Sequence, residues 1–150
     1  MRVTLSHPEI FANLVESEFG IRFQRPVKGI STDSRQIKEY DLYIALKGQK
    51  VDGHDFVKNA EKLGASAALI SEPNDKISIQ QIKVKNPLAE IGRIANAWRK
   101  QFDIPIIGIT GSNGKTSTKE LLSHVLSNNF YVHATEGNFN TDIGLPLTLL

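Results

Sequence analysis

The residues with the clearest chemical potential form a glycine-rich stretch, Gly108-Ile109-Thr110-Gly111-Ser112-Asn113-Gly114-Lys115-Thr116. An apolar run, Ile106 to Ile109, leads into it and a helix-type pattern follows, which is the context that a phosphate-binding loop requires. Glycines let successive backbone N–H groups converge on anionic oxygens, and a helix N-terminus adds its dipole. The stretch therefore predicts nucleotide phosphate binding, with Lys115 reaching the terminal phosphates and the Thr116 hydroxyl ligating Mg²⁺.

The loop departs from the commonest phosphate-loop pattern at Ile109, because that pattern has a glycine five positions before Gly114. Its glycines stand instead at positions 108, 111 and 114. This spacing also fails the dinucleotide pattern G-x-G-x-x-G, so we do not expect a nicotinamide site. A flexible turn that contains Gly-Lys-Thr by chance is the alternative, and the strand-to-helix context favours phosphate binding over it.

Two polar segments in the first third of the chain also have side chains that can bind a ligand. Ser31-Thr32-Asp33-Ser34-Arg35 combines hydroxyls, a carboxylate and a guanidinium, which can form charge-assisted hydrogen bonds to a polar ligand. Physical chemistry alone favours an Asp–Arg pair that stabilises a turn. Asp52-Gly53-His54-Asp55 can supply a base or metal ligands, although His54 and Asp55 more often cap a helix. The four histidines have no zinc-type spacing, so we expect no metal cluster built from them.

A third polar segment, Gly137-Asn138-Phe139-Asn140-Thr141-Asp142-Ile143-Gly144, is rich in amide side chains and glycine. It follows the second strand expected beyond the phosphate loop, Tyr131 to Thr135. Loops at the carboxyl ends of strands border the ligand crevice in open α/β sheets. From the residues alone, ligand binding and a plain turn before a helix near Pro146 are equal alternatives.

Apolar spacing and turn residues predict the elements that must position these segments. A helix from Pro8 to Phe19 is expected to begin with Ser6 capping the N–H of Glu9 and to end at Gly20. Further helices are expected over residues 55–63, from Pro87 behind an Asn86 cap, and after the phosphate loop, with an inner side formed by Leu121, Leu122, Val125 and Leu126. Strands are expected over residues 27–32, 41–46, 67–71, 77–84, 106–109 and 131–135.

Strands that alternate with helices predict an α/β fold, mixed rather than wholly parallel. A new strand–loop–helix unit starts near residue 103. We therefore expect a small mixed-sheet N-terminal α/β domain over residues 1–102. Residues 103–150 are expected to be the incomplete start of a P-loop parallel-sheet ATPase domain, because only two strands are expected there.

Composition excludes several classes of protein. Hydrophobic residues make up 40% of the chain and charged residues 23%, which is typical of a globular protein. The net charge of +2, from 18 basic and 16 acidic residues that are scattered, predicts no nucleic-acid partner. No apolar stretch approaches the roughly 20 residues of a membrane span, and the N-terminus lacks the apolar core of a signal peptide. We therefore expect a cytoplasmic protein, and with no cysteine it has neither disulfides nor thiolate metal sites.

Several of these segments, in the same order, resemble the Mur ligases, the ATP-dependent amide-forming enzymes of peptidoglycan precursor synthesis. The similar blocks are Thr32 to Arg35, Asp41 to Leu46 with Gly48, Asp52 to Phe56, and Ile109 to Thr116. The segment Gly137 to Leu150 is similar to the branch of the family that adds D-alanyl-D-alanine to UDP-N-acetylmuramoyl-tripeptide. Two positions depart from the family pattern: Tyr40 stands where glycine precedes Asp-Leu, and Thr141 stands where a third Asn is common.

The resemblance implies which residues contact each substrate. The N-terminal domain is expected to hold the UDP end of the muramoyl-peptide, with Thr32, Ser34 and the loop Gln49-Lys50-Val51 on the uridine side. Arg35, Asn138 and Asn140 are further substrate-binding candidates. The central domain is expected to bind ATP and Mg²⁺ through Thr110, Gly111, Ser112, Asn113, Gly114, Lys115 and Thr116. Lys115 and Thr116 are the catalytic candidates, and Thr116 is the metal ligand.

The resemblance also implies a reaction. A substrate carboxylate attacks the γ-phosphoryl group to form an acyl phosphate, and the amine of D-alanyl-D-alanine then displaces phosphate. The alternatives are the sister ligase that adds the diamino acid, a folate polyglutamate synthase, or a P-loop nucleotide-binding module without ligase activity. The block Thr32 to Arg35 argues against the folate enzyme. We expect a monomer, and we expect the isolated 150 residues to be catalytically silent.

Overall fold

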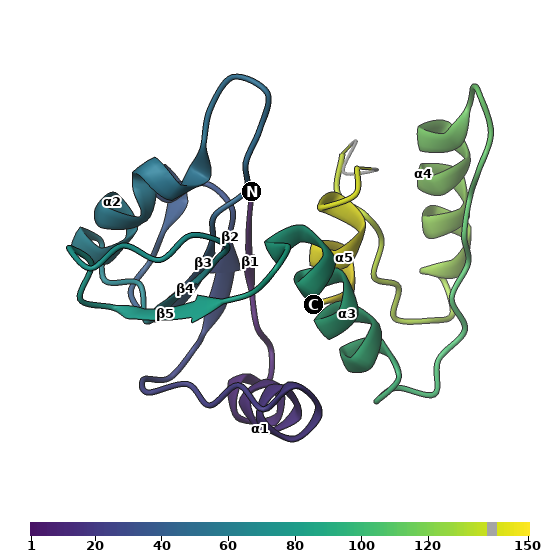
Figure 1. Cartoon of the computed structure of the whole chain (residues 1–150). Coiled ribbons are helices and arrows are strands. Elements are labelled where there is room, and N and C mark those ends of the chain that lie inside the picture. The colour runs from purple at the N-terminus through teal and green to yellow at the C-terminus, as the bar shows by residue number, and fades with distance from the viewer. Residues whose placement is uncertain (138–140) are drawn as a thin grey trace.

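The first 83 residues form a five-stranded sheet in the computed structural model, which describes residues 1–137 and 141–150 (Figure 1). Its strands follow sequence order: β1 (Arg2–Thr4), β2 (Gly29–Ser31), β3 (Asp41–Ile44), β4 (Ala67–Ile70) and β5 (Gln80–Lys83). β1 runs antiparallel to β2, and the four later strands are parallel to one another. The predicted mixed α/β fold is therefore confirmed, whereas the short edge strand β1 was not predicted.

Helices cover both faces of this sheet. The α-helices of the described chain are α1 (Pro8–Phe19), α2 (Val57–Lys62), α3 (Pro87–Arg99), α4 (Lys115–Leu126) and α5 (Gly144–Leu149), of which α4 does not pack on the sheet, and there are short 3-10 turns η1 (Ser34–Gln36) and η2 (Gly53–Phe56). α1 and α3 pack on one face of the sheet. α2 packs on the other face, together with Ile37, the residue that follows η1. In the described residues no helix is long and apolar enough to cross a membrane.

The two cores follow from the alternation of side chains along each strand. In β3, Leu42 and Ile44 point into the larger core with α1 and α3, whereas Tyr43 points to the α2 side. Register extends each row across the sheet, because Ile30 of β2 pairs with Leu42 and Leu42 pairs with Ala67 of β4. Burial on both faces explains why these strands read as continuous apolar runs.

The larger core closes around aromatic side chains from both covering helices. The ring of Phe11 in α1 meets Trp98 in α3 edge to face, with centroids 5.9 Å apart. Phe102, just beyond α3, meets Trp98 in the same way at 5.3 Å. These ring contacts fix α3 to α1, since such pairs add to the free energy gained from burial.

The ends of α1 and α3 show two of the three expected caps. Gly20 ends α1 in the left-handed conformation, with φ of 66°, as a C-cap glycine does. Asn86 caps α3, because its Oδ1 accepts hydrogen bonds from the N–H groups of Leu88 and Ala89. The prediction that Ser6 caps α1 is wrong. His7 occupies the N-cap position without a side-chain cap bond, so the capping box does not form.

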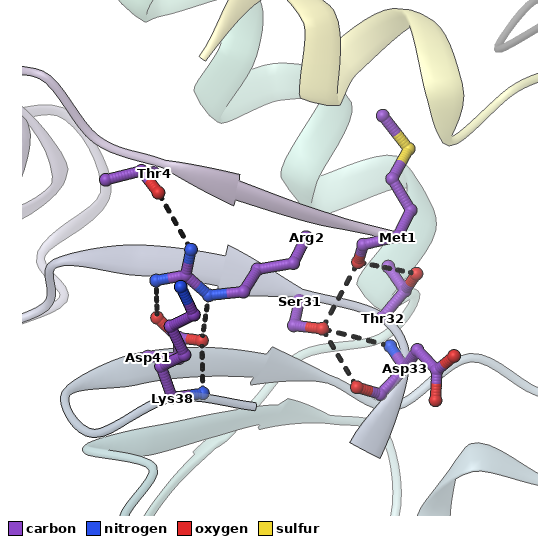
Figure 2. Close-up of polar contacts among 8 residues, drawn as sticks. All are labelled: Met1, Arg2, Thr4, Ser31, Thr32, Asp33, Lys38 and Asp41. Atoms are coloured by element: carbon purple, nitrogen blue, oxygen red, sulfur yellow. Dashed lines mark hydrogen bonds and ion pairs between the residues drawn. The ribbon is translucent and has the colours of Figure 1, made fainter. Parts of the chain in front are cut away.

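A buried ion pair fastens β1 to the parallel strands (Figure 2). The Arg2 guanidinium donates to both carboxylate oxygens of Asp41, with Nε–Oδ2 of 2.7 Å and Nη2–Oδ1 of 2.9 Å. The Asp41 side chain has no exposed surface, and the backbone N–H of Lys38 donates to its Oδ2 at 2.8 Å. A carboxylate taken out of water is stable only when it is paired and hydrogen-bonded in this way.

Gly29 is the residue that lets this pair reach across β2. A Cβ atom at this position would lie 2.5 Å from Asp41 Oδ1 and 2.7 Å from Arg2 Nη2. Only a residue without a side chain leaves room there for a bidentate pair between the strands on either side. The pair and the glycine therefore form one structural unit.

Tyr40, which replaces the glycine of the family pattern, has φ of 68° and is the single non-glycine residue of positive φ in the described parts of the chain. Its backbone forms two hydrogen bonds, from Lys28 N to Tyr40 O and from Tyr40 N to Gly64 O. Cations cover its ring: Lys28 Nζ lies 4.7 Å and the Arg25 guanidinium 5.2 Å from the centroid. These contacts offset the steric cost of the left-handed backbone, about 1–2 kcal/mol.

The chain beyond α3 differs from the sequence prediction. Neither residues 106–109 nor residues 131–135 form a strand. Ile106 and Ile107 are 48% and 58% exposed rather than buried. Both predictions are wrong for the same physical reason: a strand needs a hydrogen-bonded neighbour, and neither segment pairs with one among the residues that the structure describes. The parallel sheet expected in residues 103–150 is therefore absent from the described residues.

The two C-terminal helices are positioned differently. α4 has no buried residue, and Leu121 and Val125 of its expected inner side are exposed, so that prediction is also wrong. α5 instead packs against α3 and β1, and its Leu147 is buried in the larger core. Figure 1 shows α5 beside α3, with α4 standing apart. A hydrogen-bond distance of 2.8 Å between His133 Nε2 and Thr148 O joins α5 to the segment that precedes it.

Removal of the Arg2 guanidinium tests the dependence of the sheet on the buried pair. We expect Arg2→Ala to lower the free energy of unfolding by about 3–5 kcal/mol, because Asp41 stays buried without its partner. Urea unfolding followed by circular dichroism measures this. The matched control is Arg22→Ala, whose side chain is 84% exposed and 3.7 Å from Glu16, with an expected loss below about 1 kcal/mol. Equal losses for the two variants would contradict the assignment.

Candidate functional site

The candidate site lies along the edge where the four parallel strands end. Their carboxyl ends lead into four polar segments, at residues 32–36, 45–53, 71–72 and 84–86. Parallel strands bring such segments to one edge of the sheet, where ligands bind in open α/β folds. The structure therefore brings together the segments around Thr32 and Gln49, which are separate in the sequence.

The turn after β2 is stabilised by its own acidic and basic residues. Asp33 Oδ1 accepts from the N–H of Arg35 at 3.0 Å and from Arg35 Nε at 2.9 Å, and Oδ2 accepts from Nη2 at 2.8 Å. These bonds lower the pKa of Asp33 to about 2, with the Arg35 side chain as the largest cause. The predicted turn-stabilising pair is confirmed. Both partners are engaged, although the guanidinium lies at the surface.

The hydroxyl residues of this turn are held by hydrogen bonds to nearby carbonyl groups and to the Asn59 side chain. Thr32 donates its N–H to the carbonyl of Met1 at 3.0 Å, which ties the turn to the start of β1. Figure 2 shows the Thr32 hydroxyl directed at the same carbonyl, at 3.5 Å. Ser31, completely buried, donates its hydroxyl to Asp33 O at 2.9 Å. Ser34 is buried, and its carbonyl accepts from Asn59 Nδ2 of α2 at 3.4 Å. The two predicted uridine-side residues are therefore placed by β1 and α2.

The predicted loop Gln49-Lys50-Val51 is the exposed tip of a narrow hairpin after β3. Gly48 N–H donates to Val51 O at 2.9 Å, and Gly53 N–H donates to Leu46 O at 2.8 Å. A Cβ on Gly53 would lie 2.6 Å from Leu46 N, so the neck of the hairpin tolerates only glycine. The hydrogen bonds at Gly48 and Gly53 therefore give the hairpin a rigid base, which holds the tip residues 49–51 in place.

Tyr43 secures this base from inside the smaller core. Its hydroxyl donates to Gly53 O at 2.9 Å. Burial, followed by the charges of Asp33 and Asp52, raises its pKa to about 12. The phenol therefore stays neutral and keeps its hydrogen bond throughout the physiological range of pH.

His54 connects the hairpin to the end of β4. Its Nδ1 lies 2.7 Å from Asp52 Oδ1, and its Nε2 lies 3.0 Å from both the backbone N and the Oγ of Ser71. Because a backbone N–H only donates, Nε2 is the acceptor and Nδ1 carries the proton that Asp52 accepts. The predicted capping roles of His54 and Asp55 are wrong. Asp52 caps η2 by accepting from the His54 N–H. Sequence reasoning missed Ser71, which no local motif marks.

A cleft of about 540 Å³ opens at this edge. It is lined by Leu46, Lys47, Gly48, Ser71, Lys85, Asn86, Pro87, Leu88, Thr141, Asp142 and Ile143. One wall comes from the strand ends of the sheet and the start of α3, and the other from the turn before α5. None of residues 110–116 lines the cleft, so the structure separates it from the phosphate loop.

The phosphate loop has the backbone that its glycines predict. Gly111 has φ of 146° and Gly114 φ of 79°, conformations that side chains disfavour. Gly114 is the N-cap of α4 and has no side chain to occupy the first-turn amides. Lys115 Nζ donates to Gly111 O at 2.6 Å across the loop. These features fit a nucleotide phosphate, because the amides and the ammonium gather at one helix end.

Lys119 is a further cation of this region that sequence reasoning missed. Its ammonium donates to the carbonyl oxygens of Thr135 and Gly137, and so ties α4 to the segment that leads into residues 138–140. The predicted substrate residues Asn138 and Asn140 lie outside the described residues. Lys119 lies in α4, one helical turn after Lys115 and outside the phosphate-loop motif. The motif therefore does not mark it.

Metal ligands are sparse in the described residues. Within residues 1–137 and 141–150, no group of three or more His, Cys, Asp or Glu side chains is placed to hold a metal ion.

Two parts of the chain match models of known protein families. Residues 26–99 match the family model described as "Mur ligase family, catalytic domain". Residues 109–150 match the one described as "Mur ligase middle domain". Together the two matches cover most of the chain and include both the strand-end turns and the phosphate loop. This chain belongs to the Mur ligase family.

Individual Mur ligases agree with that assignment. The chain is 42% identical over 129 residues to the UDP-N-acetylmuramoyl-tripeptide–D-alanyl-D-alanine ligase of Bacillus subtilis (strain 168), covering 85% of this chain and 28% of that one. Identity to the ligase of the same name from Escherichia coli (strain K12) is 41%, over 81% of this chain and 26% of the relative. The chain therefore spans a little over a quarter of the length of the curated relatives it matches.

Solved Mur ligase structures share the fold. A crystal structure of MurF from Acinetobacter baumannii superposes with a TM-score of 0.82 at 33% identity, over 92% of this chain and 32% of that one. MurF ligase from Thermotoga maritima, solved in complex with ADP, gives a TM-score of 0.74 at 35% identity, over 80% and 28% of the two chains.

The low pKa of Asp33 gives a test of the turn after β2. Because its pKa falls from 3.8 when unfolded to about 2 when folded, the stabilisation it provides is present above pH 4 and is lost as the pH falls toward 2. NMR titration of the Asp33 carboxyl carbon should therefore give a midpoint near 2. In Arg35→Gln the midpoint should rise toward 3.8. An unchanged midpoint in that variant would mean that Arg35 is not the cause.

Proposed function

We propose that this chain is part of an ATP-dependent ligase that adds D-alanyl-D-alanine to UDP-N-acetylmuramoyl-tripeptide in peptidoglycan precursor synthesis. The observation that carries the proposal is the phosphate loop at the start of α4, with two left-handed or extended glycines and a lysine folded across it. Its support is the similarity of about 40% identity to ligases of that name.

The proposal divides the work between two domains, one over residues 1–102 and one that residues 103–150 begin. The family matches end at residue 99 and resume at 109, which supports a boundary between them. The first domain binds the UDP end of the substrate through Thr32, Ser34 and Arg35 on the turn after β2 and through Gln49, Lys50 and Val51 on the hairpin tip. We place the enzyme in the cytoplasm as a monomer.

The strand-end turns suit the binding of a uridine. The backbones of Thr32 and Ser34 are fixed by the Met1 carbonyl and by the Asn59 side-chain amide, so their positions are set before a ligand arrives. Preorganised groups lose little conformational entropy on binding. The hairpin tip supplies amide and cationic groups from a rigid base, which can close on the nucleoside from the other side.

The phosphate loop binds ATP and Mg²⁺ in this proposal through Thr110, Gly111, Ser112, Asn113, Gly114, Lys115 and Thr116. ATP supplies the phosphoryl group that turns a substrate carboxylate, a poor electrophile at neutral pH, into an acyl phosphate with a leaving group. Lys115 must leave the Gly111 carbonyl to meet a phosphate, and it then neutralises negative charge that develops during transfer. The loop amides orient the phosphates, and the Thr116 hydroxyl contributes to holding Mg²⁺.

Phosphate release by the complete ligase tests this function. With UDP-N-acetylmuramoyl-tripeptide, ATP and D-alanyl-D-alanine, turnover should occur, and a diamino acid offered with the UDP-dipeptide should give none. The reverse preference would identify the sister ligase. Phosphate release that needs neither peptide nor amine would identify a nucleotide-binding module without ligation.

Replacement of Lys115 tests the role of the loop in the same assay. We expect Lys115→Ala to lower turnover by at least about 100-fold, because a preorganised charge at the phosphates is lost. Circular dichroism should show a folded protein, since α4 buries no residue. The control is Lys100→Ala, an exposed residue at the C-cap of α3, which should keep full turnover. Normal turnover by Lys115→Ala would overturn the proposed function.

A further inference from the structure

Two cations and one aromatic ring gather at the amino ends of the parallel strands, on the edge of the sheet opposite the candidate site. Lys28 immediately precedes β2, and Tyr40 immediately precedes β3. Lys28 Nζ lies 4.7 Å and the Arg25 guanidinium carbon 5.2 Å from the centroid of the Tyr40 ring. These three residues are called the Tyr40 cluster below. None of them has a part in the function proposed above.

We propose that the Tyr40 cluster is a docking site for an acidic segment of a partner protein, whose carboxylates bind Arg25, Lys28 and the Tyr40 hydroxyl. This docking site does not depend on the proposed ligase function, because it uses neither the strand-end turns nor the phosphate loop. A partner bound at this edge leaves the carboxyl ends of the strands open, so docking is compatible with substrate binding.

The two cations of the cluster have no acidic partner within the described chain. Both are exposed, and neither forms an ion pair in residues 1–137 and 141–150. Asp41, which starts β3, is already paired with Arg2. Glu39 is exposed and forms no ion pair among the same residues. The cluster therefore has two positive charges that are close together and uncompensated, and carboxylates bind such donors through charge-assisted hydrogen bonds.

Backbone contacts hold the cluster in place before a partner arrives. The N–H of Lys28 donates to Tyr40 O at 2.7 Å, and the N–H of Tyr40 donates to Gly64 O at 3.0 Å. Arg25 Nη1 donates to Ala65 O at 3.5 Å, which leaves the other guanidinium N–H groups available. The Tyr40 hydroxyl has no hydrogen bond within the described residues, so it is a further available donor. Preorganised donors lose little conformational entropy on binding.

The backbone at Tyr40 is strained for a residue with a side chain. Its φ of 68° lies in the left-handed region, which glycine adopts without steric strain. The glycine of the family pattern would fit this backbone but would supply neither a ring nor a hydroxyl. Strained residues gather at binding sites, where the side chain makes a contact that the relaxed residue cannot make. The strain therefore points to a binding role for the tyrosine.

The number and placement of the charges favour a protein over other anionic partners. Anionic membrane surfaces attract clusters of about four to eight basic residues, whereas this cluster has two. Nucleic acids need a broader basic face, and the 18 basic residues of the chain are scattered among 16 acidic ones. No cluster residue lines the cleft, so a small anion would stay open to water. Tyrosine and arginine, by contrast, are enriched in protein–protein interfaces.

NMR titration of the isotope-labelled 150-residue chain with an octaglutamate peptide tests the site. We expect the largest amide shifts at residues 25, 28, 40 and 64–66, and none with an octaglutamine peptide. Because exposed charges are screened, binding should weaken several-fold between about 0.05 M and about 0.5 M salt. Shifts spread evenly over the exposed lysines of the chain would overturn the proposal.

Arg25→Gln should lower the affinity for octaglutamate about fivefold or more, because a guanidinium donor to carboxylate is lost. The matched control is Arg99→Gln. Arg99 is exposed in the last turn of α3, and it too has no ion pair among the described residues. Its replacement should leave the affinity unchanged. Equal losses in the two variants would show that any exposed arginine suffices, and the docking site would then be wrong.

Tyr40→Gly separates a binding role from a structural one. Glycine relieves the left-handed backbone, and this relief offsets the lost ring contacts, so the urea midpoint should stay close to that of the unsubstituted chain. The affinity for octaglutamate should nevertheless fall several-fold, because the ring no longer orders the two cations. A tyrosine with a merely structural role would give a lower urea midpoint and an unchanged affinity, which contradicts the proposal.

Vesicles of phosphatidylserine and phosphatidylcholine distinguish a membrane from a protein partner. We expect the chain to stay in solution when such vesicles are sedimented at physiological salt, since two cations give too little attraction. Sedimentation with the vesicles that Arg25→Gln abolishes would overturn the assignment to an acidic protein segment.

Discussion

The bidentate ion pair between Arg2 and Asp41, at the start of β3, holds the edge strand β1 on the sheet, and the first turn of the candidate site depends on β1. It joins the antiparallel strand β1 to β3 across β2, and it requires Gly29 beneath it. Because Asp41 has no exposed surface, its charge is tolerable only with this partner and the Lys38 N–H in place. The same attachment brings the Met1 carbonyl to the N–H of Thr32, and so fixes the first turn of the site.

The remaining turns of this edge share one physical device. Asp33 and Asp52 each accept hydrogen bonds from the backbone and side chain of a residue two positions later. Short acidic side chains can satisfy backbone N–H groups that a strand end leaves unpaired. In the second case the partner, His54, extends the network to Ser71 on the next strand. Local caps therefore order two of the turns at this edge, and the second reaches the cleft through Ser71.

The two regions that we propose to bind nucleotides owe their geometry to different causes. The strand-end site depends on long-range contacts, since its parts come from β2, β3, β4 and the turn before α5. The phosphate loop depends on local backbone conformation, since Gly111 and Gly114 adopt angles open mainly to glycine and the helix starts immediately after them. This difference explains how α4 presents an organised loop although its own apolar side chains are exposed.

Local signals were sufficient for much of the fold and for the phosphate loop. The Asn86 cap, the Gly20 stop and the apolar spacing of α1 and α3 predicted those helices correctly, because helices are specified by neighbours in the chain. The strands over residues 106–109 and 131–135 were wrongly predicted, because an apolar run becomes a strand only when another strand supplies hydrogen bonds.

The sequence by itself determined the fold class, the phosphate-loop conformation and the Asp33–Arg35 turn, all of which depend on residues close together in the chain. The tertiary structure alone decided that Arg2 pairs with Asp41, that His54 serves Ser71 rather than a helix end, and that α5 packs against α3. Each of those contacts joins residues far apart in the sequence or on different elements. No periodicity or motif encodes such contacts, since burial and strand register select the partner.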